Sequence, residues 1–579
     1  MKTKQLDLIT CLFIVFLSLF IFVNGLNVHG FEFRDDEIFY VKSTTEMVQS
    51  GNIMSPKYFG EDRFQKPILF YWLILLSYKM FGISWFSARF VSCLFAAATL
   101  VVTWLTAKSL FNRRVANLAT LILMTMPLFF RHAKNAVPDV ALNFFVVLAL
   151  YFFVRFNEEK QASRYSLLFF IACALGFMIK GFAAIIVPFM TIILYSAYKR
   201  EWSILKGMHF LKGLAVLFLI VSPWFLYMLN LHGIDYFKYM WFKETSDRLL
   251  NVEGGNFFLV KSLSFLEHAW FYFQIILQQF APWSVISYMG LGYALTKIRK
   301  KGVRNEAVVF LFFWVFVVYF FFSFMYFTIS HYMLVMTAPV AILTSYFLLY
   351  SFETNSISGR ILTFSRTYYV VFVFSLLALA YSFIMVFFAN LSMMVLVIIG
   401  MLYVVSVRFV LRSNSPMAGP IVLGGVILLI GFQTSYLSNL GLTTHTTLRK
   451  FAETINQQHL IKYSIGVGSH DLHEKELQIY FSDVRVEKVA NDNDQYTTYM
   501  LKQLFGKNES VYCLITEKDY NKYLKDIFEN TKIIQKEFIL RKQLNIDRGF
   551  LVALLNFDRQ RIYDYFMESV VLVKREKDV

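Results

Sequence analysis

The sequence predicts a multi-span α-helical membrane protein with a small α/β domain at its C-terminal end. Hydrophobic residues make up 57% of the 579 residues and charged residues only 16%, which is not the balance of a soluble domain. Apolar runs long enough to cross a bilayer as helices recur up to about residue 440. Beyond about residue 441 charges become frequent, and strand-like runs alternate with helical ones.

Hydropathy and loop charge predict about thirteen transmembrane helices. The first run lacks a small-residue cleavage site and is therefore expected to be retained as a span. The expected spans lie near residues 7–23, 85–107, 115–130, 140–156, 165–179, 182–198, 210–230, 269–296, 307–327, 331–350, 367–388, 391–411 and 419–440.

The distribution of charge predicts the orientation of these spans. Lys2 and Lys4 precede the first run, which places the N-terminus inside by the positive-inside rule. The basic clusters of the short loops then all face the inside, and residues 24–84, 231–268 and the region after 441 face the outside. The chain therefore divides into a transmembrane domain, 1–440, and an extracytoplasmic α/β domain, 441–579.

Charge and cysteine content exclude several classes of function. The formal net charge of +17 comes from loop clusters that suit anionic lipid, and no basic stretch is interleaved with aromatics to bind nucleic acid. The four cysteines show no CxxC spacing, so neither a disulfide framework nor a redox pair is expected. The C-terminal domain, with expected strands near 464–468, 511–516 and 549–555, has no nucleotide-binding glycine signature.

Basic residues on the outer side break the inside bias and predict a cationic cavity for an anionic head group such as a lipid phosphate. Taken singly, each of them is equally well explained as a side chain that snorkels at the interface. They are Arg63, Lys66, Arg131, Lys134, Lys180, Lys243 and Arg248.

Two carboxylates lie at matching depth on the outer side. Asp36 follows the first span, and Asp139 follows Pro138 at the start of the fourth, where helix capping is an equally good explanation. Such a pair could hold a divalent metal, deprotonate an acceptor, or orient a cation against a phosphate. His268 and His331 also lie near outer span ends, but a lone interfacial histidine is more often a satisfied polar group than a ligand.

Several segments in one order resemble the bacterial lipid A aminoarabinose transferases. These belong to the polyprenyl-phosphate-dependent glycosyltransferases that include the protein O-mannosyltransferases. Residues 36–40 resemble the family's D-E-x-R-Y, residues 63–72 its Y-F-E-K-P-P-L-x-Y-W, residues 131–139 its second acidic turn, residues 180–181 its T-K-G-P turn, and residues 330–332 its L-P-x-Y segment. The resemblance covers roughly residues 1–350 and is specific as an ordered set.

The resemblance implies a GT-C fold whose donor sugar is carried on undecaprenyl phosphate and passes to lipid A at the periplasmic face of the bacterial inner membrane. Asp36 and Asp139 would be the acidic catalytic pair, and His268 would contribute to a metal site. The residues expected to bind the donor or its phosphate are Lys66, Arg63, Lys180, Arg131, Tyr332, Tyr40 and Glu37.

The chain departs from the family pattern in ways that leave alternatives open. Gln65 stands for the glutamate before Lys-Pro, which puts a divalent metal in doubt. Phe39 stands for the arginine of D-E-x-R-Y, and either Arg34 or Arg63 is a candidate to replace its charge. The sugar is aminoarabinose, galactosamine or a hexose, and the acceptor is lipid A, a protein or another glycan. Oligomeric state is not predicted.

A transporter for a lipid-linked solute is the alternative from another class. Transporters tend to show repeats and helices broken by Gly or Pro at mid-membrane. The sequence shows neither, because its ionisable residues gather at the outer face.

Overall fold

The computed structural model describes residues 2–26, 35–159, 161–239, 257–299 and 306–350, together with Arg408 and parts of 444–575. The chain forms two compact units, one with Met1–Leu26, Phe39–Leu377 and Leu402–Gly431, the other with Asn27–Ile38, Ala378–Met401 and Phe432–Val579. The expected spans at 367–388 and 419–440, nearly all of 391–411, and the expected domain boundary at 441 lie outside the described residues.

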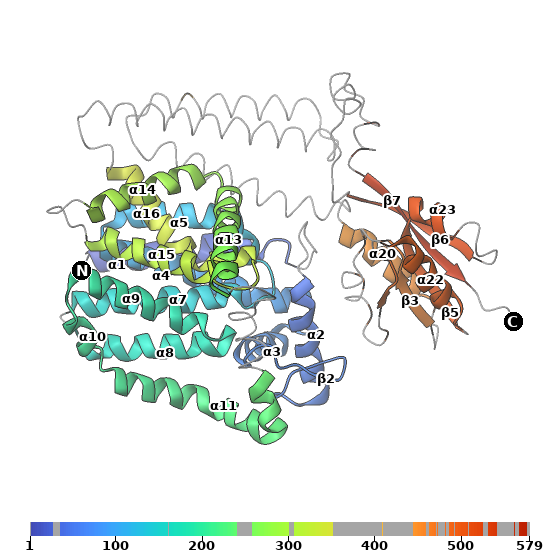
Figure 1. Cartoon of the computed structure of the whole chain (residues 1–579), viewed down its shortest axis with the longest axis horizontal. Coiled ribbons are helices and arrows are strands. Elements are labelled where there is room, and N and C mark those ends of the chain that lie inside the picture. The colour runs from blue at the N-terminus through green and yellow to red at the C-terminus, as the bar shows by residue number, and fades with distance from the viewer. Residues whose placement is uncertain are drawn as a thin grey trace. The chain divides into compact units, whose positions relative to one another are not determined.

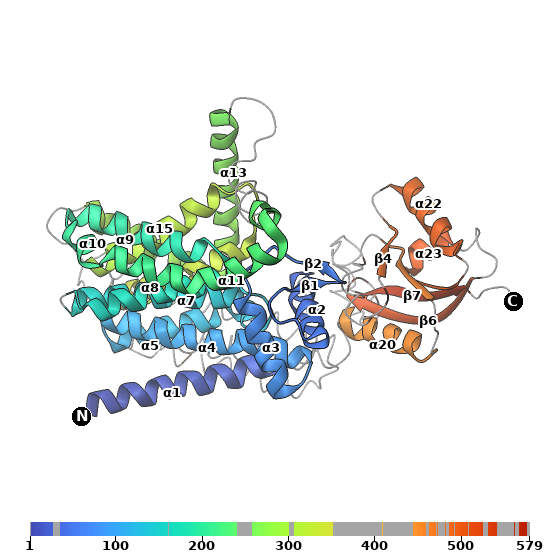
Figure 2. The ribbon, with the colours of Figure 1, turned by 90° about the horizontal axis from the view of Figure 1, so that it is seen from below.

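Long helices that run alongside one another build the first unit (Figures 1 and 2). Within the described residues, seven helices are long and apolar enough to cross a membrane, which confirms the multi-span helical class. The helices of this bundle are α1 (Lys2–Val23), α4 (Trp85–Leu110), α5 (Arg113–Thr125), α7 (Asp139–Glu158), α8 (Ser163–Lys180), α9 (Ala183–Lys199), α11 (Phe210–Lys238), α14 (Ser284–Arg299), α15 (Glu306–Ser323) and α16 (Thr337–Tyr350).

Helix α7 lies at the centre of the bundle, where small residues allow close approach of its neighbours. A Cβ added at Gly176 of α8 would lie 2.8 Å from the Cβ of Ala184 and 2.9 Å from that of Phe145. Such contacts are how helices pack where lipid removes the hydrophobic drive between them. Because α7 has 20 residues, it spans about 30 Å from Asp139 to Glu158.

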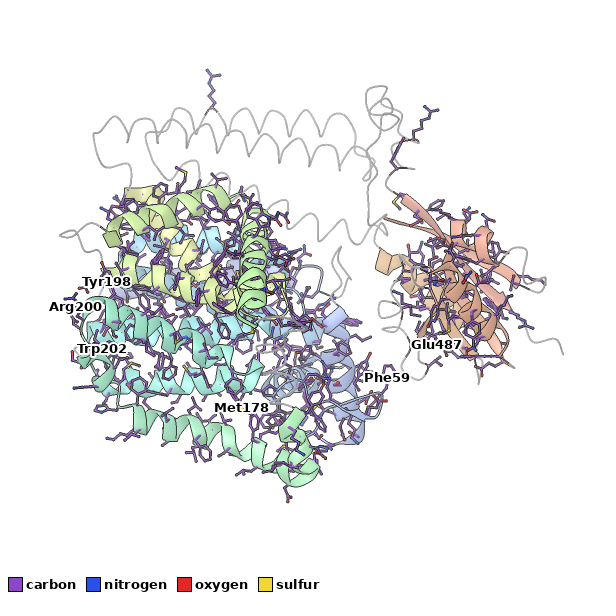
Figure 3. The ribbon with its side chains drawn as sticks, viewed as in Figure 1. Phe59, Met178, Tyr198, Arg200, Trp202 and Glu487 are labelled. Carbon is purple, nitrogen blue, oxygen red and sulfur yellow. The ribbon has the colours of Figure 1, made fainter. Side chains whose placement is uncertain are left out.

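Basic side chains gather at one end of the bundle, which we call the basic end. There Asp7 of α1 pairs with Lys108 and with Arg113 Nη2, the latter at 2.8 Å, and Lys199 Nζ lies 3.0 Å from Glu306. Figure 3 shows Arg200 at this end and Met178, two residues before the end of α8, toward the other. The opposite end, which we call the α3 end, carries α2 (Asp35–Ser50), the hairpin β1 (Lys57–Tyr58) and β2 (Glu61–Asp62), α3 (Leu69–Phe81) and α6 (Pro127–His132).

Two expected spans differ in the structure because prolines interrupt them. The run 269–296 is not one helix but the end of α13 (Phe257–Gln279) and most of α14, separated by Phe280–Trp283. Pro282 lacks an N–H and disfavours helical geometry in the residue before it, so the helix ends there. Helix α13 runs across the direction of α14 in Figure 1. In the run 115–130, Pro127 likewise separates α5 from α6.

The second unit is built on a five-stranded sheet of order β4-β3-β5-β7-β6. Strand β3 pairs in parallel with β4 and β5, whereas β7 pairs antiparallel with β5 and β6. Alternate residues of β5 face two separate apolar clusters, Tyr512 and Leu514 in one, Val511 and Cys513 in the other. The elements are α20 (Thr444–Asn456), β3 (Tyr463–Val467), β4 (Val486–Lys488), α22 (Asp494–Phe505), β5 (Ser510–Thr516), α23 (Glu517–Tyr523), β6 (Thr531–Leu540) and β7 (Met567–Arg575).

This sheet confirms the expected α/β region at the C-terminal end. The strands expected near 464–468 and 511–516 correspond to β3 and β5. The strand expected at 549–555 lies outside the described residues, and β6 and β7 were not expected.

Candidate active site

A buried carboxylate at the α3 end pairs with two groups from distant segments. Asp139 is 6% exposed, and its Oδ1 accepts a hydrogen bond from Lys180 Nζ at 2.5 Å. The same oxygen lies 3.3 Å from Nε2 of His331, which belongs to the 3-10 helix η2 (Ser330–Met336). Side chains from three separate segments of the sequence thus meet in one group of contacts, which we call the Asp139–Lys180–His331 cluster.

Helix geometry explains why this acid and this base lie at these positions. Asp139 is the first residue of α7 and Lys180 the last of α8, so each charge has the sign that its helix end favours. Helix α8 stops because Gly181 adopts φ 97°, a conformation that other residues rarely enter. Charges this deeply buried are tolerated only when they are paired, and the capping explanation for Asp139 is therefore incomplete.

Aromatic rings and a second histidine surround the cluster. The Tyr332 ring stacks on Phe322 with centroids 4.5 Å apart, and Lys180 Nζ lies 5.8 Å from the Tyr332 centroid. The rings of His331 and His132 are 6.0 Å apart. His132 Nδ1 lies 2.7 Å from the carbonyl oxygen of Leu128, so this nitrogen carries a proton and donates it. The resemblance pointed to Tyr332 and Lys180 but missed both histidines.

A second cationic group joins the first two sequence motifs. Arg63 Nε donates a hydrogen bond to Tyr71 Oη at 2.9 Å. The guanidinium carbon lies 4.3 Å from the ring centroid of Phe39 and 5.7 Å from that of Tyr40, and the Tyr40 and Tyr71 centroids are 5.3 Å apart. We call these four side chains, together with Phe70, whose ring centroid lies 5.4 Å from that of Tyr40, the arginine–aromatic group. In this group the Arg63 guanidinium lies over the ring of Phe39, the residue that stands where the family motif has an arginine.

The other expected site residues are placed by the structure, but their roles stay predictions. Asp36 and Glu37 lie in the first turn of α2, where Asp36 is exposed and Glu37 is fully buried. Lys66 is half-buried and precedes α3 by two residues, and Arg131 is half-buried in α6. Arg34, Lys243 and Arg248 lie outside the described residues.

Lys134, expected among the phosphate-binding cations, instead holds the end of α1. Its Nζ donates to the carbonyl oxygen of Asn24 at 2.6 Å, and Arg89 Nη1 donates to that of Leu26 at 3.1 Å. The last carbonyls of a helix have no partners within it, and cations satisfy them well. A helix end attracts a cation as readily as a lipid phosphate does, so the contact explains Lys134 without a ligand, and its phosphate-binding role stays a prediction.

The Lys134 contact gives a pH-dependent stability. Burial lowers the pKa of Lys134 from its ordinary 10.5 to about 8. Between these two values the unfolded chain binds more protons than the folded one, so the stability rises with pH across that window. We expect the wild type to gain on the order of 2 kcal/mol relative to Lys134→Met between pH 7 and pH 9.5. Unfolding of the detergent-solubilised protein at both pH values measures it, and an unchanged difference would contradict it.

The residues present do not fit the metal site that the family implies. Within the described residues, no group of three or more His, Cys, Asp or Glu side chains could hold a metal ion. Gln65 offers a neutral amide whose Nε2 already donates to Tyr239 Oη at 3.2 Å. His268 Nδ1 lies 3.3 Å from the carbonyl oxygen of Ser323 and donates to it, so only its Nε2 could ligate a metal, and the described residues do not place that nitrogen in a group of three or more such ligands. No step of the reaction is therefore routed through a metal.

Comparisons with known proteins find transferases. Residues 65–227 match the family described as Dolichyl-phosphate-mannose-protein mannosyltransferase. The chain is 29% identical over 316 residues to the undecaprenyl phosphate-alpha-4-amino-4-deoxy-L-arabinose arabinosyl transferase 2 of Proteus mirabilis (strain HI4320), and 30% identical over 317 residues to the corresponding transferase of Aeromonas hydrophila. These matches cover 54% and 53% of this chain and 54% of each relative, so the chain spans about half the length of the relatives it matches.

A solved structure matches nearly the whole chain. The crystal structure of ArnT from Cupriavidus metallidurans bound to undecaprenyl phosphate superposes with a TM-score of 0.66, covering 99% of this chain and 98% of that one at 16% identity. At this identity the match establishes the fold alone. The chain therefore has the GT-C fold of that protein, and the resemblance to the bacterial lipid A aminoarabinose transferases that its motifs predict is confirmed.

Proposed function

We propose that the chain is a glycosyltransferase that moves a sugar, of the aminosugar class, from undecaprenyl phosphate to lipid A at the periplasmic face of the inner membrane. The Asp139–Lys180–His331 cluster carries this proposal. It places a buried cation, Lys180, paired with Asp139 at one end of a membrane bundle. Such a cation suits the phosphate of a lipid carrier. The names of the relatives support the choice of donor, and the lipid A acceptor follows from the resemblance of the sequence motifs.

In the proposed reaction, an acceptor oxygen attacks the anomeric carbon of the sugar. The bond between that carbon and the carrier's phosphate oxygen breaks, and undecaprenyl phosphate leaves with the electron pair. Lys180, and with it Lys66 and Arg63, stabilises the negative charge that develops on the departing phosphate. Asp139 holds Lys180 and His331 in place, and the Tyr332 ring beside Lys180 lines the donor cavity.

The role of Asp36 depends on the acceptor. A lipid A phosphate is already an anion, so it attacks without a base, and Asp36 then positions groups around it. A hydroxyl acceptor must lose a proton, for which the exposed Asp36 is the proposed base. The match of residues 65–227 to the protein mannosyltransferases favours protein hydroxyls as the second candidate acceptor.

Lipid A from cells with and without the gene tests the acceptor. We expect mass spectrometry to show lipid A that carries an added aminosugar only when the gene is present. A lipid A fraction of unchanged mass, with glycosylated proteins instead, would replace the lipid acceptor by the protein hydroxyl.

Substitutions in the first outer loop test the remaining site residues. Asp36→Asn and Lys66→Ala are each expected to lower transfer at least about 100-fold, the scale of losing one charged group at the reacting centre. Transfer is measured with purified protein and undecaprenyl-phosphate sugar. Lys57→Ala, which removes an exposed lysine of the hairpin, is the matched control and should retain activity. Full activity of either test variant removes that residue from the site.

A further inference from the structure

The segment Asn52–Lys66, which carries Arg63 and Lys66, is fastened along the end of α11. Trp224 Nε1 donates to the carbonyl oxygen of Met54 at 3.0 Å. His232 Nε2 lies 3.1 Å from Ser55 Oγ, and its Nδ1 lies 3.6 Å from Asp62 Oδ2. The segment is therefore held to the helix at several points before it reaches Lys66.

An aromatic box continues this attachment next to the site. Helix α11 breaks at Gly233, which has φ 67°, so that its last residues turn from the axis of the preceding helix. Phe64 contacts the rings on both sides of this break, with centroids 4.9 Å from His232, 5.3 Å from Tyr236 and 5.9 Å from Tyr239. The residue that follows Phe64 is Gln65.

Gln65 makes the last contact of this segment before Lys66, a hydrogen bond to Tyr239 that we call the tie. Its Nε2 donates to Tyr239 Oη at 3.2 Å, while its Oε1 is buried and has no hydrogen-bond partner within the described structure. A carboxylate at this position would bury a negative charge, which is stable only beside a cation. The neutral amide needs no such cation. Only its Oε1 could ligate one, and the described residues supply no group of three or more His, Cys, Asp or Glu side chains to complete a site.

We propose that Gln65 is a positioning residue that fixes Lys66 against α11 through Tyr239 and does so without a divalent metal. The inference rests on the proposed function in taking the donor phosphate as the ligand of Lys66. The tie itself follows from the contacts of Gln65, Phe64 and Tyr239 and is open to measurement without any substrate.

Hydrogen–deuterium exchange of the full-length protein in nanodiscs tests the tie. Gln65→Met and Tyr239→Phe each remove the hydrogen bond at little change in volume, and we expect both to speed exchange of the backbone amides in residues 52–66. EDTA should leave exchange of the wild type unchanged, and metal analysis should find far less than one metal ion per chain. The matched control is Gln49→Met, an exposed glutamine of α2.

Binding of undecaprenyl phosphate then tests positioning. Each single variant is expected to raise the Kd about fivefold, the scale of one neutral hydrogen bond. The double variant should be no weaker than either single one, because both remove the same contact. In the transfer assay kcat should fall along with the affinity, because Lys66 also stabilises the charge that develops on the departing phosphate, whereas Gln49→Met should change neither.

The outcomes separate this inference from the proposed function. A wild type that binds no undecaprenyl phosphate refutes the proposed donor, whereas the exchange experiment still decides whether the tie exists. Unchanged exchange in Gln65→Met would overturn the inference. So would a double variant whose loss of affinity equals the product of the two single losses. A stoichiometric metal whose removal speeds exchange in residues 52–66 would also overturn it.

Discussion

Lys180→Met is expected to abolish sugar transfer and to destabilise the protein in the same step. The substitution leaves the Asp139 carboxylate buried without its closest cation, and breaking a buried pair by removing one partner costs about 3–5 kcal/mol. Losing a buried cation proposed to stabilise the departing phosphate should lower kcat/KM at least about 1,000-fold. Thermal unfolding in detergent measures the first effect and transfer from undecaprenyl phosphate the second.

The double variant Asp139→Asn/Lys180→Met distinguishes a catalytic lysine from a structural one. Removing both charges leaves no unpaired ion, so much of the lost stability should return. Transfer should not return, because the cation that stabilises the leaving group is still missing. A double variant that recovers both stability and activity would show that Lys180 serves only to neutralise Asp139.

Lys199→Met is the matched control for this experiment. Lys199 also pairs with a carboxylate, Glu306, with 3.0 Å between the two groups, but it does so at the basic end of the bundle. We expect this variant to lose some stability and to retain its kcat. A loss of kcat similar to that of Lys180→Met would mean that losing any lysine–carboxylate pair, even one with an exposed carboxylate, affects turnover through stability alone.

In the Asp139–Lys180–His331 cluster, the positions of two residues could be predicted from the sequence, but the pairing of the three could not. The positions of Asp139 and Lys180 were predictable because a charge at the end of an apolar helix is costly and marks a function. Their pairing was not predictable, since it depends on how α7, α8 and η2 pack. His331 was judged an ordinary interfacial histidine, and only its contact with Asp139 shows otherwise.

The fold could likewise be predicted only in part: its apolar runs were identified, but not every break or strand. Hydropathy identifies apolar runs but averages over single residues, so it read through Pro282 and joined α13 to α14. The direction of the chain survived this error, because α14 alone carries it from the α3 end to the basic end. Strands β6 and β7 were not predicted for a different reason, since each combines a short continuous apolar run with charged residues and lacks the alternation typical of a half-buried strand.

Arg63→Ala is expected to lower transfer about 100-fold, because we propose that Arg63 supplies the charge that the family motif has at position 39. The guanidinium lies 4.3 Å from the Phe39 ring and donates to Tyr71 Oη, so its plane is fixed from two sides. Arg63→Lys should stay within about threefold of the alanine variant. Lysine keeps the charge but has neither the planar fork for a phosphate nor the stacking surface for a ring.

An exchange of the two residues is the decisive form of this experiment. Phe39→Arg/Arg63→Tyr returns both positions to the residues of the family motifs and moves the cation to the other side of the same contact. We expect it to recover transfer to within about tenfold of the wild type, although each single substitution is strongly impaired. Arg164→Ala, which removes a guanidinium 4.9 Å from the Tyr165 ring at the basic end, should leave transfer unchanged. If the exchange variant is as inactive as Arg63→Ala, then Arg63 does not replace the family arginine, because the charge alone would have been restored without effect.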